Sequence, residues 1–249
     1  MGFIVNYNSK NEIKIFYTTD ELSDYLGNIW KSKTDNLREG EFYSIALSGG
    51  NTPIKIFQYL SKNYKDRINW NRVKFFWGDE RCVPPNDSDS NYKLAKDYLF
   101  NNIQITEENI FRIKGEIAPN VEADDYANIL KSNLKSINGV PQIDFVLLGL
   151  GEDGHTASIF PHQIELFNSD RFCEVAVHPI SGQKRITITG SVINNAGTIA
   201  IIAVGKNKAD RVYEIINNTE VAKTYPASLV NLTNSEVNWF LDSESASRL

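Results

Sequence analysis

LLGLGEDGHTASIFPH, residues 147–162, joins the end of an apolar run to a glycine-rich turn and a histidine. The apolar run is typical of a buried strand, and Gly149, Gly151 and Gly154 follow it. Glycine permits positive φ and a close approach of the backbone, so such a turn can bring main-chain N–H groups up against a ligand. His155 stands just beyond the strand end, where open α/β sheets place their chemistry, and its ordinary pKa suits general-base work near neutral pH. A tight strand–helix connection with a surface histidine gives the same bare pattern.

The composition narrows the class of protein. The chain has 249 residues, of which 41% are hydrophobic and 23% charged, as in ordinary globular proteins. Its formal net charge of −5 and the lack of a long basic run argue against a nucleic-acid partner. An anionic small substrate stays compatible with this charge, because local charge in a cleft can oppose the global sign.

The cysteines and the N-terminal segment indicate the cellular compartment of the protein. Cys82 and Cys173 have neither a metal-type spacing nor a disulfide framework, so we expect no metal site and a reducing environment. No signal-peptide pattern opens the chain, and no apolar window approaches the length that spans a bilayer. We therefore expect a cytoplasmic protein with no membrane partner.

Apolar runs alternate with helical patterns along most of the chain. The runs typical of strands cover residues 43–47, 73–77, 143–149, 174–178, 185–189, 198–204 and 237–241. This alternation predicts an α/β fold with three layers, α/β/α, in which helices cover both faces of a mostly parallel, Rossmann-like sheet. A small antiparallel piece is expected around residues 170–190. Without repeats or a break in composition, we expect one domain over residues 1–249.

Apolar spacing predicts two helices in detail. Thr52 and Pro53 are expected to start the first helix as its N-cap and its N1 proline. Its buried face would hold Ile56, Phe57, Leu60 and Tyr64. The second helix would carry an outer face of solvated acidic residues, Glu122, Asp124 and Asp125. Its inner face would hold Ala123, Tyr126, Ala127, Leu130, Leu134 and Ile137.

A first candidate binding segment directly follows the predicted strand 43–47. A strand, a turn rich in serine and glycine, and a capped helix present free N–H groups and the positive end of a helix dipole, which suits a phosphate. The glycine and lysine spacing of a Walker A motif or a dinucleotide fingerprint is missing. A helix cap without a ligand is the alternative. The residues concerned are Ser48, Gly49, Gly50, Asn51 and Thr52.

A second candidate segment follows the predicted strand 73–77. Asp79, Glu80 and Arg81 are three adjacent ionisable residues that lead into a proline-stiffened loop, as in a pocket wall. Arg81 can hold an anion or stabilise a developing oxyanion. A solvated cluster of salt bridges would give the same pattern.

Two cations late in the chain form a third candidate. Arg185 begins the run RITIT, and Lys208 lies at the start of a helix that follows the strand 198–204. A lysine in the first turn opposes the helix dipole, and an anionic ligand would relieve that conflict. Lys206 fits a solvated surface lysine better. His162 and His178 each adjoin a proline, and we interpret both as structural or surface residues.

The combination of these segments resembles the 6-phosphogluconolactonase family, in the superfamily that also contains glucosamine-6-phosphate deaminase. The block around His155 carries the most specific part of the resemblance. The matching segments, in the family's order, are ALSGGNTP (46–53), WGDERCVP (77–84), DSN (89–91), DFVLLGLGEDGHTASIFP (144–161), RITIT (185–189) and GKNKADRV (205–212).

The resemblance implies hydrolysis of 6-phospho-D-glucono-1,5-lactone to 6-phosphogluconate, a step of the oxidative pentose phosphate pathway, without a metal or other cofactor. His155 would be the general base that activates water, and Asp153 with the loop glycines, Gly151 among them, would orient it and frame the intermediate. Arg81 would line the lactone site beside Asp79. Arg185 and Lys208 would clamp the phosphate, aided by N–H groups of residues 49–52. The implied partner is a small phosphorylated sugar lactone, bound by a monomer or weak homo-oligomer.

Two other functions share parts of this sequence pattern. In the deaminase a run Ala-Phe-Asn-Glu-Pro follows the Gly-His pair, whereas here Thr156–Pro161 follows, so the catalytic glutamate of that motif has no counterpart. A sugar-phosphate-sensing module of a transcription regulator would need a helix-turn-helix segment. The chain before Tyr43 is too short and too polar for one.

Overall fold

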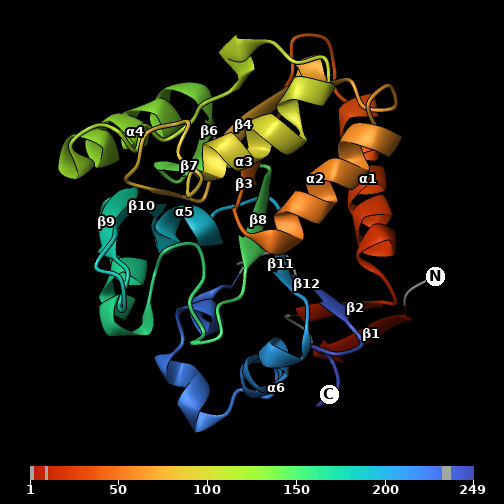
Figure 1. The fold of residues 1–249 in the computed structure, drawn as a ribbon, viewed down its shortest axis with the longest axis vertical. Coiled ribbons are helices and arrows are strands. Elements are labelled where there is room, and N and C mark those ends of the chain that lie inside the picture. The colour runs from red at the N-terminus through yellow and green to blue at the C-terminus, as the bar shows by residue number, and fades with distance from the viewer. Residues whose placement is uncertain (1–2, 9–10, 232–236) are drawn as a thin grey trace.

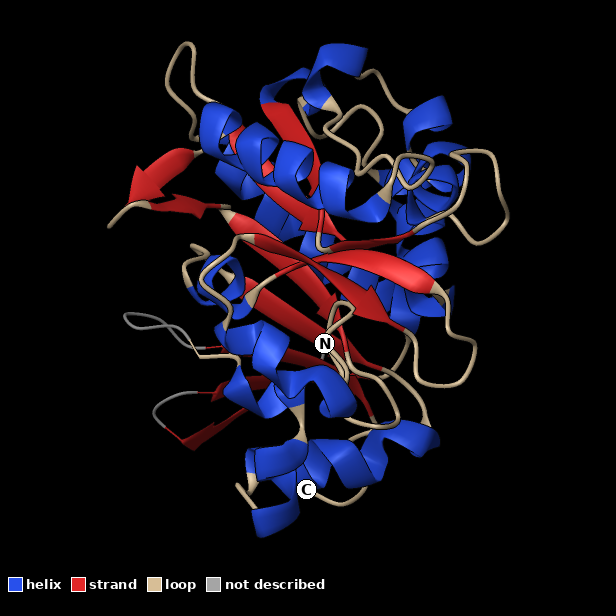
Figure 2. Cartoon of the chain, turned by 90° about the vertical axis from the view of Figure 1, so that its left-hand side faces the viewer, coloured by secondary structure: helices blue, strands red, loops and turns tan. Residues whose placement is uncertain are grey.

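The computed structural model describes residues 3–8, 11–231 and 237–249. A seven-stranded sheet runs through the middle of the molecule, with helices on both of its sides (Figures 1 and 2). From β2 to the far edge all neighbouring strands are parallel, and β1 pairs antiparallel with β2. The strand order is β1 (Phe3–Asn8), β2 (Asn11–Phe16), β12 (Val237–Asp242), β11 (Ile199–Ala203), β8 (Phe145–Gly149), β3 (Tyr43–Leu47) and β4 (Val73–Trp77).

Helices and short 3₁₀ segments connect the strands. The α-helices are α1 (Thr19–Asp35), α2 (Asn51–Asn63), α3 (Asn91–Tyr98), α4 (Pro119–Asn133), α5 (Gly190–Asn194) and α6 (Ala209–Ile216). The 3₁₀ segments are Trp70–Arg72, Phe100–Asn102, Glu107–Asn109, Pro161–Asn168, Lys206–Lys208, Glu220–Thr224 and Pro226–Leu229. None of the helices in the described ranges is both long and apolar enough to cross a membrane.

Two small antiparallel sheets complete the fold. One has the order β5 (Asp79–Arg81), β10 (Lys184–Ile188), β9 (Cys173–Val177), and the other is the hairpin of β6 (Lys135–Ile137) and β7 (Val140–Gln142). The expected three-layer α/β fold with a mostly parallel sheet is therefore confirmed. The antiparallel piece expected around residues 170–190 is confirmed as well, with β5 as an additional strand.

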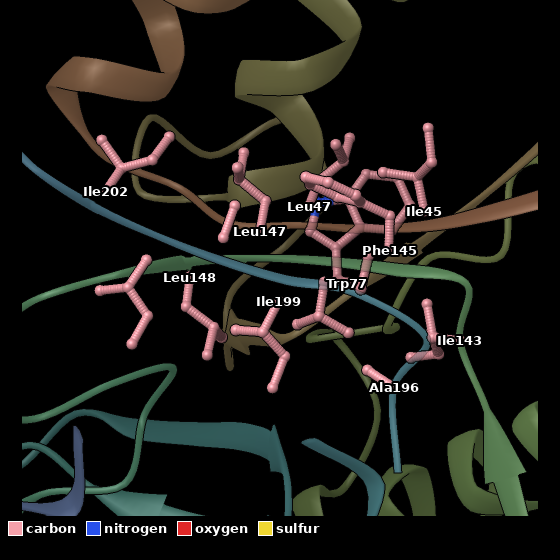
Figure 3. Packing of buried hydrophobic residues seen from close by; sticks show 14 of the residues in the cluster. Ile45, Leu47, Trp77, Ile143, Phe145, Leu147, Leu148, Ala196, Ile199 and Ile202 are labelled. Carbon is pink, nitrogen blue, oxygen red and sulfur yellow. The ribbon is translucent and has the colours of Figure 1, made fainter. Parts of the chain in front are cut away.

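The central strands are buried on both faces, which explains their continuous apolar sequence. Every residue of β3 and β11 is buried. Figure 3 shows how side chains from neighbouring strands pack together, among them Leu47, Trp77, Phe145 and Ile199. Burying each such side chain contributes roughly 1.5–3 kcal/mol relative to leaving it exposed. This packing holds the ends of β3 and β8 in a fixed relation.

The order of these strands creates a switch point. The chain passes from β3 outward to β4, then returns so that β8, β11 and β12 follow on the other side of β3. The connection from β3 leads to β4 on one side and that from β8 leads toward β11 on the other, so the segments that leave the carboxyl ends of these two neighbours diverge. Open α/β sheets bind ligands in the crevice that forms there.

Two details of the predicted helices are wrong. Helix α2 starts at Asn51 with Gly50 as N-cap, at φ 112°, so Thr52 and Pro53 are its second and third residues. Its buried face is confirmed. Helix α4 ends at Asn133, and Ile137 lies in β6 with 42% of its surface exposed. Asn138 and Gly139, both at positive φ, form the turn of the β6–β7 hairpin instead.

The acidic residues of α4 do not share one environment. Glu122 is only 1% exposed, and its carboxylate accepts a hydrogen bond from the Lys114 backbone N–H at 2.7 Å. The expectation of a solvated side chain is therefore wrong for Glu122. It is met by Asp124 and Asp125, which are exposed.

Candidate active site

A cavity of about 540 Å³ opens at the carboxyl ends of β3 and β8, at the switch point of the sheet. Its volume lies in the range of small-molecule sites. The ends of β3 and β8, the strands β5 and β10, and the turn before α6 meet around it. The predicted site residues that line the cavity are Ser48, Gly49, Asp79, Arg81, Gly151, Asp153, His155, Arg185 and Lys208.

Asp153 and His155 form a hydrogen-bonded pair in the turn that follows β8. Nδ1 of His155 lies 2.5 Å from Oδ1 of Asp153, and the same oxygen accepts the His155 backbone N–H at 3.2 Å. Partial burial acts to raise the pKa of Asp153, but the hydrogen bonds and charge of His155 outweigh it and lower the pKa to about 2. An ionised Asp153 accepts the Nδ1 proton, which leaves the Nε2 lone pair of a neutral His155 free to take a proton.

Two glycines allow the turn to pack closely against its neighbours. A Cβ atom at Gly151 would lie 2.1 Å from Nδ1 of His155 and 2.6 Å from Oδ1 of Asp153. Gly154, at φ 86°, lies against the ring of Tyr225, which a Cβ would approach to 2.4 Å. The loop closes on itself through a hydrogen bond from Gly151 N–H to the His155 carbonyl at 2.8 Å. The glycine-rich turn therefore holds the histidine ring directly over its own backbone.

The small sheet forms another wall of the cavity. Arg185 pairs with Arg81 on one side and with Ala176 on the other, and Thr187 pairs with Asp79. Residues directly opposite in an antiparallel sheet point to the same face, as do residues two apart along a strand. Asp79, Arg81 and Arg185 therefore share the face that lines the cavity.

Glu80 points to the opposite face of the small sheet. It is 2% exposed, and its carboxylate accepts hydrogen bonds from the backbone N–H groups of Asn91 and Tyr92, each at 2.8 Å, and from the hydroxyl of Ser90 at 3.0 Å. Burial raises the pKa of Glu80, and these hydrogen bonds oppose that effect. Glu80 thus fastens the start of α3 to β5.

The arginines of the cavity retain unused donors. Arg81 donates from Nη1 to the Asp89 carbonyl at 2.5 Å. Arg185 donates from Nη1 to the Ser158 hydroxyl at 3.4 Å, and that hydroxyl donates to Asp79 at 2.5 Å. Burial lowers the pKa of Arg185, and the charge of Asp79 opposes this. Among the described residues, nothing accepts a hydrogen bond from the buried Nε of either arginine.

The remaining predicted anion-binding residues line an adjoining cavity of about 330 Å³. Gly50, Asn51 and Thr52 surround it at the N-terminus of α2, and Lys208 lines both cavities. The first turn of a helix presents free N–H groups and the positive end of its dipole. Pro53 contributes none, because proline lacks an N–H.

Lys208 is the N-cap residue of α6, where a positive charge opposes the helix dipole. Partial burial lowers the pKa of Lys208, and Glu152 and Asp153 act in the opposite direction. Both cavities together thus offer one ammonium group, two guanidinium groups and a helix N-terminus to an anion.

Several residues that line the cavity were not predicted as site residues, among them Asn91, Phe160 and His178. Asn91, the first residue of α3, donates from Nδ2 to the Asp79 carbonyl at 2.9 Å, and its Oδ1 meets no donor within the described ranges. Phe160 packs against His155 at a ring-centroid distance of 4.7 Å. His178 lines the cavity, although its position next to a proline indicated a structural or surface residue.

The register of the hairpin explains how His178 reaches the cavity. Arg185 pairs with Ala176, and His178 follows two residues later on the same face. If the predicted strands 174–178 and 185–189 are paired in this register, His178 lies on the same face of the hairpin as Arg185.

Nowhere in the described ranges do three or more His, Cys, Asp or Glu side chains form a group that could hold a metal ion.

Comparisons with known proteins show the family that the chain resembles in sequence and in fold. A family model described as glucosamine-6-phosphate isomerases/6-phosphogluconolactonase matches residues 18–239. The chain is 39% identical over 204 residues to a 6-phosphogluconolactonase of Treponema pallidum, covering 82% of this chain and 83% of that one. It is 42% identical over 199 residues to a 6-phosphogluconolactonase of Haemophilus influenzae, covering 80% and 84%. A solved structure described as devB protein matches with a TM-score of 0.90 and 37% identity, covering 96% of this chain and 99% of the other.

Proposed function

The chain belongs to the family of glucosamine-6-phosphate isomerases and 6-phosphogluconolactonases, and on that premise we propose that it hydrolyses 6-phospho-D-glucono-1,5-lactone with His155 as general base. Its curated relatives at 39% and 42% identity are 6-phosphogluconolactonases, and the chain is likewise an enzyme that hydrolyses a lactone ester. The observation that carries the assignment of the base is the 2.5 Å contact between Asp153 and His155 in the cavity.

In the proposed reaction, Nε2 of His155 removes a proton from water while the water oxygen attacks the lactone carbonyl carbon. The negative charge that develops on the carbonyl oxygen needs a donor. The bond from that carbon to the ring oxygen then breaks, and the imidazolium of His155 returns the proton to the departing oxygen. Asp153 keeps the ring in the required tautomer and stabilises the imidazolium. The product is the open-chain acid, which ionises at neutral pH.

Arg81 is the donor we propose for the developing oxyanion. The backbone N–H groups of Leu150, Gly151, Gly154 and His155 already donate to other groups within the protein. The guanidinium of Arg81 lines the same cavity as His155 and carries a full charge. A fixed cation in a partly desolvated site stabilises such an oxyanion more than water does.

We assign the phosphate of the substrate to the cations of the cavity. Lys208 lines both the main cavity and the one at the N-terminus of α2, so an anion there would meet its ammonium group and the free N–H groups of Asn51 and Thr52. Arg185 lines the main cavity from the side of the small sheet. The two cations would then approach the substrate from different segments of the chain.

The deaminase activity found in the same superfamily is less well supported. Ring opening and proton transfer between adjacent carbons would need a carboxylate in the segment Thr156–Pro161, which contains none. Counted from His155, the position of the glutamate in that motif is occupied by Ile159, a fully buried apolar residue.

The proposal is tested with freshly generated 6-phosphogluconolactone, coupled to 6-phosphogluconate dehydrogenase and corrected for spontaneous opening. We expect rapid hydrolysis by the wild type and a kcat about 10²–10⁴-fold lower for His155→Ala, the range for loss of a general base. His162→Ala is the matched control, because His162 also packs on Phe160 but does not line the cavity. Ammonia release from glucosamine 6-phosphate tests the deaminase. Full activity of His155→Ala would remove His155 from the mechanism, and no acceleration by the wild type would refute the lactonase function.

A further inference from the structure

His178 lines the cavity but has no part in the proposed mechanism. It follows β9 directly, and its backbone N–H donates to the Gln183 carbonyl at 2.9 Å across the β9–β10 hairpin. Its side chain lies on the face that also carries Arg81 and Arg185, and it lines the main cavity. The residue is therefore built into the wall rather than placed on a free loop.

The hairpin loop fixes the tautomer of His178. The backbone N–H groups of Ile180 and Ser181 both donate to its Nδ1, at 3.3 Å and 3.2 Å. A nitrogen that accepts from two donors carries no proton, so the proton of the neutral ring sits on Nε2. Within the described part of the chain no hydrogen bond engages Nε2. The ring therefore has a free N–H donor, fixed by the backbone on its far side.

The aromatic neighbours hold the ring in place. His178 packs edge-on against Phe160, with ring centroids 5.3 Å apart and an interplanar angle of 82°. The same Phe160 ring contacts His155 at 4.7 Å, so both histidines rest on one buried side chain. A donor positioned by packing on one side and by backbone groups on the other is preorganised for a ligand.

The charges around His178 favour its neutral form. Partial burial lowers the pKa of His178, the positive charges of Arg185 and Arg81 lower it further, and the charge of Asp153 acts in the opposite direction. A protonated ring would also present an N–H at Nδ1 to the two loop donors. Both effects keep the imidazole uncharged near neutral pH.

From this geometry we infer that His178 is a substrate-binding residue whose neutral imidazole donates its Nε2–H to an uncharged oxygen, a hydroxyl or a lactone oxygen, of the bound sugar lactone. The inference rests on the proposed function for the identity of the substrate. The cavity already offers three cationic side chains for the phosphate and the oxyanion, Arg81, Arg185 and Lys208. A neutral donor adds recognition of the sugar without adding positive charge.

Two substitutions separate this role from a purely structural one. His178→Leu keeps an apolar side chain against Phe160 but removes the donor, and His178→Gln restores an N–H donor. We expect kcat/KM for the lactone to fall about tenfold in His178→Leu, the size of one hydrogen bond between neutral partners, and to recover to within about threefold in His178→Gln. The inhibition constant for inorganic phosphate should stay unchanged in both variants. His162→Leu serves as the control.

A measurement without turnover tests the tautomer. In ¹⁵N-histidine-labelled wild type at pH 7, we expect His178 as the neutral Nε2–H form, with its Nε2–H resonance shifting when 6-phosphogluconate is added but not when inorganic phosphate is added. Unchanged kcat/KM in His178→Leu, a charged or Nδ1–H ring, or equal loss in the Leu and Gln variants would overturn the inference. If the wild type hydrolyses the lactone, any of these outcomes refutes only the role of His178. An inactive wild type refutes the lactonase function, and the sugar lactone as ligand with it.

Discussion

Replacing Gly151 by alanine tests whether the position of the His155 ring limits the reaction. The added Cβ would lie 2.1 Å from Nδ1 of His155 and 2.4 Å from Cε1, whereas ordinary contact between heavy atoms begins at about 3.5 Å. The ring must therefore retreat by more than roughly 1 Å, and its side chain, 27% exposed, can do so into the cavity. A misplacement of about 1 Å costs about 10²-fold in rate, equivalent to about 2.7 kcal/mol in the activation free energy.

The assay compares kcat and the thermal midpoint of unfolding for Gly151→Ala. The φ of Gly151 is not among the positive values, so alanine introduces no backbone strain there and the midpoint should not fall by more than about 2 °C. Gly78→Ala is the matched control, because a Cβ at Gly78 would meet its nearest neighbour at an ordinary 3.7 Å and this residue does not line the cavity. Its kcat should equal that of the wild type.

A double substitution distinguishes displacement of the ring from obstruction of the substrate. If Gly151→Ala acts only through His155, adding it to His155→Ala should lower kcat by less than about twofold, since effects carried by one residue do not add. A full 10²-fold loss in the His155→Ala background would mean that the new methyl group blocks the substrate. An unchanged kcat in the single variant Gly151→Ala would refute the reasoning altogether.

Two further substitutions, Asp153→Asn and Lys208→Met, test other parts of the site. Asp153→Asn should lower kcat about 10²–10⁴-fold, because an amide can donate to Nδ1 of His155 and so favour the wrong tautomer; a retained kcat between pH 6 and 9 would contradict this. The pKa of Asp153 is lowered to about 2, so the stability that its carboxylate contributes is present above about pH 4 and is lost as the pH falls through about 2. The difference in thermal unfolding midpoint between wild type and Asp153→Asn should therefore disappear near pH 2. Lys208→Met should raise KM for the lactone and weaken inhibition by inorganic phosphate at unchanged kcat, and a loss confined to kcat would exclude Lys208 from phosphate binding.

The central sheet could be predicted from the sequence because its strands are buried on both faces. The predicted bounds of residues 43–47 and 73–77 coincide with β3 and β4. By contrast, β1 and β2 at the edge of the sheet, and β5 with its three charged residues, lack a continuous apolar run and were not predicted. Short strands that alternate between polar and apolar residues depend on their partners, which local sequence does not reveal.

The errors in the helices have local causes. Thr52 and Pro53 are good starting residues for a helix, yet the tight turn after β3 puts Gly50 at the N-cap, where its positive φ is tolerated. The apolar spacing of α4 continues to Ile137 by coincidence, because Asn138 and Gly139 favour a hairpin turn and draw the preceding residues into β6. In both places turn geometry overrides a pattern that suits a helix.

The candidate site was predictable where it depends on segments at strand ends. His155, Asp153 and the residues after β3 lie where parallel strands end, and parallel sheets bring those ends together. His178 and Asn91 reach the cavity through antiparallel pairing and through the hydrogen bonds of Glu80, which are contacts between distant segments. Residue types alone could not show these contacts.

The pairing of β5 with β10 also bears on how the protein folds. Asp79 and Arg81 come from the first half of the chain, but the strand that aligns them with Arg185 belongs to the second half. Contacts between such distant segments close late, because the loop entropy must be overcome before they form. A nascent chain that ends before β10 contains β3 and β4, but it lacks the strand that completes the wall of the cavity. Recovery of activity during refolding would then report the pairing of β5 with β10, later than the packing of Trp30 against Trp70 within the first half of the chain.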